Sequence, residues 1–396
     1  MDINEAKRQA VEVIDSCREL LLEVSHSIHS HPEENYAEHH AHDVLTAALE
    51  SNGLDVQRGA YGMPTAFEAS TGTSGPEIAV FCEYDALPGI GHACGHNIIA
   101  AAGLGATLGA AAVAKELNGR LRVFGSPAEE GGGGKVFMLE RGALDGIDAA
   151  MMVHPADADL RWMNTIAVQQ LLITWHGEAA HAAAQPWNGR NALDAAVLGY
   201  MNVAALRQHI RPDERIHGVF TNGGDKPNIV PASAAMHWFV RAGDIASLEQ
   251  LKARVLAALK AGGEATGCST EFSWLEPSYA ELVRNAPFEN LYAANSAALG
   301  RVVAEPDGEI NVVGSTDMGN VSHVVPSIHP MIAVAPSGVG IHTEKFTDFA
   351  ASPAGDAGVL DGAKAMAMTI IDLWSSPELL QSVTDAFASR GNLRVL

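Results

Sequence analysis

The chain has 396 residues, of which 47% are hydrophobic and 18% are charged, a balance that is typical of a globular protein and excludes wholesale disorder. Its formal net charge of −22 argues against nucleic acid and anionic membranes as partners. A chain of this length exceeds one typical hydrophobic core, so we expect two domains.

Apolar runs in the first and last parts of the chain predict a buried core. Residues 121–125 and 149–153 read as buried strands, and a third such run follows at 331–335. Residues 98–114 are rich in Ala and Gly and slightly short for a membrane span, so we interpret them as a buried helix. Continuous apolar strands with helical patterns between them favour a parallel sheet that is covered on both faces.

The segment GHACGHN, residues 91–97, follows an apolar strand and places Cys94 and His96 in one tight turn. Thiolate and imidazole together suit zinc and its neighbours in the periodic table, whereas magnesium and calcium prefer oxygen. A single short turn rarely completes a metal site, so other parts of the chain must supply further ligands.

Further candidate ligands follow the other predicted strands. Glu129 and Glu130 come after the strand at 121–125, His154 follows the strand at 149–153, and His342 comes after the strand at 331–335. In parallel sheets, binding and catalytic residues lie at the carboxyl ends of the strands. We therefore expect these side chains to lie together at one edge of the sheet. Two adjacent carboxylates are costly to bury unpaired, and one of them could act as a general base near a cation.

The middle of the chain has a different organisation. Its predicted elements run strand, helix, strand, strand, helix, strand, at residues 169–175, 191–208, 216–221, 234–240, 248–261 and 270–274. This order fits a small ferredoxin-like α+β sandwich inserted into the larger domain. We therefore predict an α/β fold with a mixed, mostly parallel sheet between helices, a catalytic domain made of residues 1–166 and 282–396, which carries the candidate ligands and base, and an inserted domain at residues 167–281.

Taken together, the motifs resemble the M20 family of metal-dependent peptidases and amidohydrolases over nearly the whole chain. Within that family the chain looks like the branch of p-aminobenzoyl-glutamate hydrolases and M20-domain dipeptidases. The hippurate-hydrolase branch usually has Met and Asp where this chain has Tyr84 and Asn97, which favours the dipeptidase-like branch. The motifs that carry the resemblance are HPE at 31–33, EYDALPG at 83–89, HACGHN at 92–97, PAEEGG at 127–132, AHAA at 180–183, NIVP at 228–231, GSTD at 314–317 and IHT at 341–343.

The resemblance implies a zinc-exopeptidase-like catalytic domain with two divalent metal ions, zinc first and manganese, cobalt or nickel as alternatives. It implies that Glu129 serves as general base and acid while hydroxide, formed from a water the metals share, attacks the amide carbonyl. The implied metal ligands are Cys94, His96, Glu130, His154 and His342.

Four further residues have roles that the resemblance implies. Asp85 would orient a ligating imidazole. Arg241, with Asn228 nearby, would hold the substrate carboxylate, and the planar fork of arginine suits that task. The inserted domain, residues 167–281, would form a lid that dimerises with the lid of a second chain. His181 would reach across that dimer and donate a hydrogen bond to the oxyanion in the partner's site.

The resulting expectation is a dipeptidase-like hydrolase of small aminoacyl- or acyl-amino-acid substrates with a free carboxylate. The alternatives are an N-acyl- or N-aroyl-amino-acid amidohydrolase with a bulky acyl group, and a non-catalytic partner chain. We expect a homodimer, or a higher homo-oligomer, that pairs through the lid and binds neither nucleic acid nor membranes. The four cysteines form no disulfide framework and the N-terminus lacks a signal-peptide core, which favours the cytoplasm.

Overall fold

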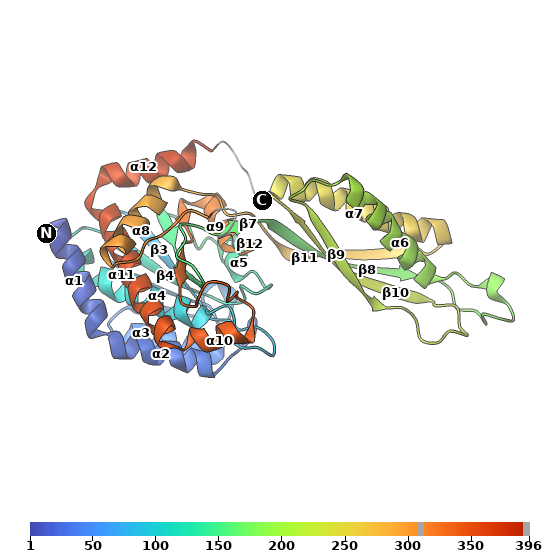
Figure 1. The fold of residues 1–396 in the computed structure, drawn as a ribbon, viewed down its shortest axis with the longest axis horizontal. Helices are drawn as coiled ribbons and strands as arrows, with labels where there is room; N and C mark the ends of the chain where they lie inside the picture. Colours follow the sequence, from blue (N-terminus) through green and yellow to red (C-terminus); the bar gives the residue numbers. More distant parts are fainter. Residues whose placement is uncertain (307–312, 391–396) are drawn as a thin grey trace. The chain divides into compact units, whose positions relative to one another are not determined.

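The chain divides into two compact units (Figure 1). The computed structural model describes residues 1–306 and 313–390. Unit 1 comprises Met1–Asn164 and Leu282–Leu396, and unit 2 comprises Thr165–Glu281. The assignment of unit 1 as catalytic and of unit 2 as a lid stays a prediction.

Unit 1 is a mixed α/β unit built around one six-stranded sheet with the order β1-β2-β4-β3-β5-β13. Its helices are α1 (Ile3–Ser16), α2 (Arg18–Ser30), α3 (His39–Ser51), α4 (His96–Ala114), α5 (Gly134–Glu140), α8 (Ala286–Ala298), α9 (Met318–Val324), α10 (Glu344–Ala350), α11 (Pro353–Ser375) and α12 (Pro377–Ala388). Its strands are β1 (Asp55–Arg58), β2 (Phe67–Thr71), β3 (Glu77–Glu83), β4 (Arg120–Ser126), β5 (Ala149–Met151), β6 (His154–Ala156), β12 (Val313–Gly314), β13 (Ser327–Ile328) and β14 (Met331–Ala333), and β7 (Asn164–Thr165) lies at the unit boundary.

The central pairings of this sheet are parallel, and antiparallel strands complete one edge. Strand β3 pairs in parallel with β4 and β5, and β13 pairs in parallel with β5. Strands β1 and β2 add the antiparallel edge. The predicted mixed, mostly parallel sheet between helices is therefore confirmed.

Strand β3 shows why the sheet is covered on both faces. Successive side chains of a strand point to opposite faces, so the middle of a strand between two helical layers is apolar on both faces. Ile78, Val80 and Cys82 pack into the core formed with α1, α4 and α11, whereas Ala79 and Phe81 pack into a second core that includes residues of α5 and α9. All seven residues of β3 are buried.

Helix α4 lies inside the larger of these two cores, beside α1 and α11. By length and composition it is the one helix among the described residues that could cross a membrane, but 89% of its most apolar window is buried inside the protein. The apolar core helix of a soluble protein passes the same test. The structure therefore agrees with the interpretation of residues 98–114 as a buried helix.

Two of the predicted strands are shorter than their apolar runs, since β5 ends at Met151 and β14 ends at Ala333. The run at 149–153 becomes β5, which pairs with β13, followed by the separate β6, which pairs with β14. Proline has no backbone N–H to donate to a neighbouring strand. Pro155 lies inside β6, and Pro330 separates β13 from β14, so both parallel ladders stay short.

Unit 2 has the predicted order of strands and helices. Its elements are β8 (Ala167–His176), α6 (Ala192–Leu206), β9 (Arg215–Asn222), β10 (Ser233–Ala242), α7 (Ile245–Thr266) and β11 (Ser269–Tyr279), with short 3-10 turns at Pro186–Asn188 and Arg207–His209. The antiparallel sheet order is β11-β8-β10-β9, in which the first and third strands of the unit lie at the centre, as in ferredoxin-like folds. Buried side chains of alternate strand positions, such as Trp175 and Trp238, pack against α6 and α7.

Candidate metal centre

The turn that contains Cys94 connects the end of β3 to the start of α4. Gly95, between Cys94 and His96, has φ +77°, and a side chain there would bring its Cβ to 2.5 Å from Pro155. The turn can therefore approach β6 closely only with glycine at this position. As a result, Cys94 Sγ lies 3.4 Å from Nε2 of His154, the first residue of β6.

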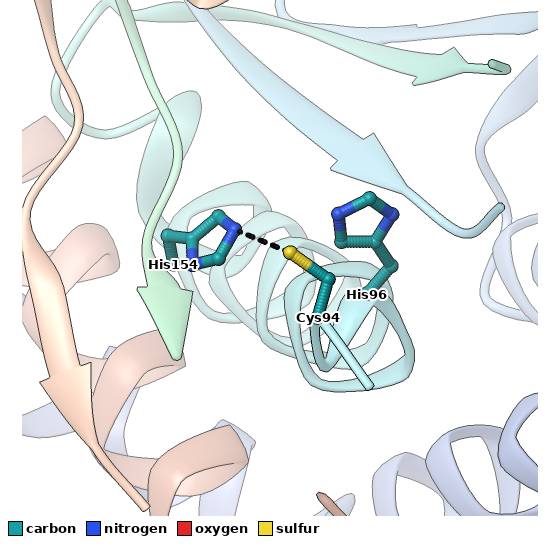
Figure 2. Close-up of side chains that lie close together, drawn as sticks. All are labelled: Cys94, His96 and His154. Atoms are coloured by element: carbon teal, nitrogen blue, oxygen red, sulfur yellow. Dashed lines mark hydrogen bonds between the residues drawn. The ribbon is translucent and has the colours of Figure 1, made fainter. Parts of the chain in front are cut away.

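Figure 2 shows Cys94, His96 and His154 converging, with the contact between Cys94 and His154 drawn as a dashed line. One ligand atom from each of the three lies within 4.8 Å of the others, and all three residues are buried. The His154 ring uses Nδ1 in a contact of 2.8 Å with the Pro155 carbonyl oxygen, so its Nε2 is the nitrogen that faces Cys94.

Glu129 and Glu130 lie in the loop after β4 and face the same region. Glu130 Oε1 is 3.8 Å from His96 Nε2 and 3.4 Å from His342 Nε2. The His342 backbone N–H donates to the Ala93 carbonyl at 2.8 Å, which fixes the His342 loop against the turn that holds Cys94. His342 is about half exposed at its side chain (49%), so the cluster opens to solvent on this side.

The loop before Glu129 is held by the buried carboxylate of Glu38, the residue that precedes helix α3. Glu38 Oε1 accepts the backbone N–H of Ala128 at 2.9 Å, and its Oε2 accepts the Thr65 hydroxyl at 2.8 Å. Ala128 has φ +60°, a left-handed conformation that is uncommon for a residue with a side chain. The hydrogen bond from Ala128 to Glu38 therefore helps to hold the loop in the conformation that presents the two glutamates.

Three overlapping groups of potential metal ligands describe the cluster. They are Cys94 with His96 and His154, Cys94 with Glu130 and His342, and His96 with Glu129 and Glu130. The structure thus brings together all five predicted ligands and the predicted base.

The donor atoms of this cluster fit a divalent cation. Two ligands that each lie about 2.1 Å from one ion are at most about 4.2 Å apart, and the nitrogen–oxygen distances of 3.4 and 3.8 Å above satisfy that limit. His96 Nε2 and Glu130 Oε1 are buried without a hydrogen-bond partner among the described residues. Buried polar atoms of this kind are costly unless they bind something, and a cation suits both.

Asp85 connects two parts of the cluster. Its Oδ1 lies 2.9 Å from His96 Nδ1, and its Oδ2 accepts the backbone N–H of Glu130 at 2.9 Å. The His96 contact leaves Nε2 directed at the cluster, as expected of a histidine that binds metal. Burial alone would raise the pKa of Asp85, but His96, the Glu130 backbone N–H and Lys135 together outweigh burial and hold that pKa below its ordinary value.

Burial also raises the pKa of two other groups of the cluster, Glu129 and Cys94. Burial, reinforced by Glu83 and Glu130, raises the pKa of Glu129 well above its ordinary value. Burial and Glu130 likewise raise the pKa of the Cys94 thiol. A bound divalent cation would favour the ionised forms of both groups, because it lies close enough to stabilise their negative charge.

A second buried cluster, which the sequence interpretation missed, adjoins the first. The Lys135 ammonium contacts Glu83 and donates to Asp317 Oδ1 at 2.6 Å, and the Lys135 backbone N–H donates to Asp317 Oδ2 at 3.0 Å. All three side chains are fully buried, and Glu83, Glu129 and Asp317 form a further group of oxygen ligands within 4.8 Å. The sequence signal that could have indicated this cluster is the presence of charged residues next to apolar segments. Such residues are rarely buried without a partner of opposite charge.

The other predicted site residues belong to unit 2 and are described within it. His181 pairs with Ile229 in an isolated bridge, and the Ala182 N–H donates to the Asn228 carbonyl at 3.1 Å, so His181 and Asn228 lie on adjacent loops. Arg241 lies on β10 opposite Val168 of β8, with its guanidinium over the Phe239 ring.

Comparisons with known proteins agree on one family. A sequence model of peptidase family M20/M25/M40 matches residues 79–370. The chain is 39% identical to a Xaa-Arg dipeptidase of Mus musculus over 96% of this chain and 92% of that protein. It is 31% identical to a component of the p-aminobenzoyl-glutamate hydrolase of Escherichia coli, over 93% of this chain and 92% of that protein.

Solved structures share the fold at lower sequence identity. An aminobenzoyl-glutamate utilization protein from Klebsiella pneumoniae matches with a TM-score of 0.72 and 19% identity, over 94% of this chain and 99% of that chain. The YXEP protein of Bacillus subtilis, described as a dinuclear metal binding peptidase, matches with a TM-score of 0.69 and 19% identity, over 91% of this chain and 99% of that chain.

Proposed function

The chain belongs to peptidase family M20/M25/M40 and is a metal-dependent hydrolase of amide bonds, and from this premise we propose that it cleaves dipeptides whose carboxy-terminal residue is Arg or Lys. The observation that carries the proposal is the 39% identity to a Xaa-Arg dipeptidase along 96% of the chain. The net charge of −22 supports it, because a strongly negative protein attracts a cationic substrate.

The proposed metal centre holds two divalent ions, zinc in the first place and manganese, cobalt or nickel as alternatives. A donor set of one thiolate, imidazoles and a carboxylate suits these metals. Cys94, His96 and Glu130 each belong to two of the three ligand groups described above, and this overlap supports two neighbouring ion positions. The proposed ligands are Cys94, His96, Glu130, His154 and His342.

Bound ions of this kind lower the pKa of water and polarise an amide carbonyl. Glu129 takes the proton from the attacking water and later gives it to the leaving amine, and its buried position beside the cluster supports that role. Asp85 keeps His96 in the orientation that directs Nε2 at the cluster.

The substrate carboxylate is assigned to Arg241, with Asn228 in support. Residues of β10 alternate between a fully buried face and a half-buried face, and Arg241 shares the half-buried face with Phe239. An arginine on the less buried face of a sheet can present its planar fork to a carboxylate.

We also propose a homodimer that pairs through unit 2 in a reducing, cytoplasmic environment, with a small-molecule substrate and no nucleic acid or membrane partner. Edge strand β9 exposes Val219 (61%) and Phe220 (43%), and α6 exposes Met201 (58%). Exposed apolar side chains beside an unpaired strand edge favour pairing with a second copy. All four cysteines are free thiols, which fits a reducing compartment.

The test is a substrate screen with protein reconstituted separately with zinc, manganese, cobalt and nickel. Xaa-Arg and Xaa-Lys dipeptides should turn over faster than dipeptides with neutral or acidic carboxy-terminal residues, and Glu129→Gln is the inactive control. The second candidate, an N-acyl- or N-aroyl-amino-acid amidohydrolase, is favoured by the likeness to the p-aminobenzoyl-glutamate hydrolase component. Faster cleavage of p-aminobenzoyl-glutamate or N-aroyl amino acids would replace the first proposal with the second, and no turnover in any arm would favour a non-catalytic role.

A further inference from the structure

We propose that Glu83, the last residue of β3, is an additional carboxylate ligand of the metal centre and that Lys135 positions it. The inference rests on the proposed function, because it adds a residue to the metal centre assigned there. Glu83 lies in the strand that precedes the Cys94 turn and is fully buried.

The two oxygens of Glu83 have different surroundings. Oε1 is in contact with the Lys135 ammonium, whereas Oε2 is buried without a hydrogen-bond partner among residues 1–306 and 313–390. Oε2 lies 3.8 Å from His96 Nε2, which is also buried and lacks a hydrogen-bond partner in the same part of the chain. When they bind a metal, Glu83 Oε2 and His96 Nε2 each offer a lone pair and carry no proton. Their separation of 3.8 Å is also too long for a hydrogen bond between them.

The distance is instead the one expected of two ligands of one cation. Glu130 Oε1 also lies 3.8 Å from His96 Nε2, and Glu129 Oε2 lies 3.9 Å from it. Glu83 therefore faces the metal-binding nitrogen of His96 as closely as the two glutamates of the loop after β4. Ligand atoms that share an ion with bonds of about 2.1 Å can be separated by up to about 4.2 Å.

Charge balance gives a second, independent reason. When both carboxyl groups are ionised, Glu83 and Asp317 place two negative charges around the single positive charge of Lys135, and all three side chains are fully buried. An uncompensated buried charge is costly, so this group favours another cation nearby. Asp317 uses both of its oxygens on Lys135, one on the ammonium and one on the backbone N–H, so Glu83 holds the free oxygen.

Lys135 determines the direction of that free oxygen. It is the second residue of α5, and its ammonium lies between Glu83 and Asp317. Because the ammonium binds Oε1, the other oxygen of the same carboxylate is left to face His96. Lys135 is thus a positioning residue that acts on the metal centre through Glu83.

The test compares metal binding by wild type, Glu83→Gln and Asp317→Asn, measured by competition with a chromophoric chelator for Co²⁺ and Zn²⁺ and by elemental analysis. Glu83→Gln should weaken the affinity for one of the two ions by about 10–100-fold, the range typical of residues that support a metal site. Asp317→Asn is the matched control, because it removes the same charge from the same buried group without removing an oxygen that faces His96. Its metal affinity should fall by the charge effect alone, and therefore by clearly less than that of Glu83→Gln.

Melting temperatures of chelator-treated protein separate this role from a purely structural one. Glu83→Gln leaves one ammonium with one carboxylate, a neutral buried group, so the metal-free variant should melt no lower than metal-free wild type. A lower melting temperature combined with unchanged metal affinity would mean that Glu83 serves only as a partner of Lys135, and the proposal would be wrong.

If Glu83→Gln does not fold, Glu83→Asp replaces it. That variant keeps the charge that pairs with Lys135 but withdraws the carboxylate by one methylene, so its metal affinity should also fall, and wild-type affinity in it would overturn the proposal. Wild-type protein that binds no divalent ion would overturn the proposed metal centre as well. Wild type that binds two ions while Glu83→Gln binds them equally tightly would overturn only the role of Glu83.

Discussion

The Asp85 carboxylate and the His96 imidazole are joined by a buried contact of 2.9 Å between Oδ1 and Nδ1. The other oxygen of Asp85 accepts the Glu130 backbone N–H at 2.9 Å. One side chain after the end of β3 therefore orients two proposed ligands that come from different segments. A carboxylate is required for this, because both of its oxygens act as acceptors.

Replacement of Asp85 by Asn should weaken metal binding by about 10–100-fold, as is typical when the partner of a ligating histidine is lost. An amide has one acceptor oxygen and one donor nitrogen, so it cannot accept from both His96 and Glu130. Chelator competition measures the affinity. Asp43→Asn serves as control because the Asp43 side chain is 69% exposed, and equal affinities in the two variants would contradict the orienting role.

Cys94→Ala should lower the metal content and the rate together, because a thiolate is a ligand and not only a packing group. Elemental analysis of protein dialysed against a limiting metal concentration measures the first effect. Cys82→Ala is the matched control: Cys82 is a buried thiol on β3 that packs in the core and belongs to none of the metal-capable groups of the described residues. Full metal content in Cys94→Ala would remove Cys94 from the ligand set.

The neighbouring glutamates should separate into a base and a ligand. Glu129→Gln should keep its metal and lose about 10²–10⁴-fold in kcat, the range for general acid–base catalysis. Glu130→Gln should lose metal affinity, because Glu130 Oε1 lies 3.4 Å from His342 Nε2. If elemental analysis and kinetics give the reverse pattern, the two roles are exchanged.

Glu38 should make stability depend on pH. Burial, with a smaller contribution from Asp85, raises the pKa of this carboxyl to about 7, against an ordinary value of about 4.3 for glutamate. The protonated form is therefore favoured in the folded state, so the stabilisation is complete below about pH 4.3 and is lost as the pH rises through about 7.

Glu38→Gln mimics the protonated form and can keep the bonds to Ala128 and Thr65. Between pH 5 and pH 8 the unfolding free energy of wild type should therefore fall relative to the variant, on the order of 1–3 kcal/mol. Urea denaturation of chelator-treated protein at the two pH values measures the difference. A gap between the two proteins that stays constant with pH would show that Glu38 does not titrate in this range.

The sequence predicted that the candidate ligands converge, because the position of each one directly after a strand can be read from its own segment. Cys94, Glu129, Glu130 and His342 each follow a strand, and strand ends of a parallel sheet meet at one rim. The same reasoning overlooked the contact between Lys135 and Glu83, which are 52 residues apart, and the contact between Lys135 and Asp317, which are 182 residues apart. Pairing of buried charges depends on side-chain rotamers in the packed core, and hydrophobic periodicity carries no information about them.

The apolar pattern of the sequence also did not predict where the strands end. The apolar run at 149–153 continues past the end of β5 at Met151, and the run at 331–335 continues past the end of β14 at Ala333. A strand ends where its pairing with the neighbouring strand ends, and the apolar pattern of one segment does not contain that pairing. In unit 2 the expected order of elements held, since alternation of buried and exposed residues with two helices between the strands admits few sheet topologies.

His181 is the last proposed site residue, and its hydrogen bonds indicate which tautomer its neutral ring adopts. Its Nδ1 accepts the backbone N–H groups of Ala183 at 3.3 Å and Ala184 at 3.2 Å. In the neutral imidazole the proton is then on Nε2, which makes that nitrogen a hydrogen-bond donor. A donor is what stabilisation of an oxyanion requires, and loss of one such donor typically costs about 10²–10³-fold in kcat.

If His181 acts in the partner's site, two inactive variants should restore each other. Glu129→Gln and His181→Ala homodimers are each expected to be nearly inactive, but a mixed dimer has one site with an intact Glu129 and an intact His181 from the neighbouring chain. After dissociation and random reassociation about half of the dimers are mixed, so about a quarter of all sites should work. Tagging each variant differently verifies the exchange, and the matched control mixes Glu129→Gln with Glu130→Gln, which should recover nothing because each chain then carries a defect in its own site. No recovery in the first mixture after verified exchange would mean that His181 acts within its own chain or outside catalysis.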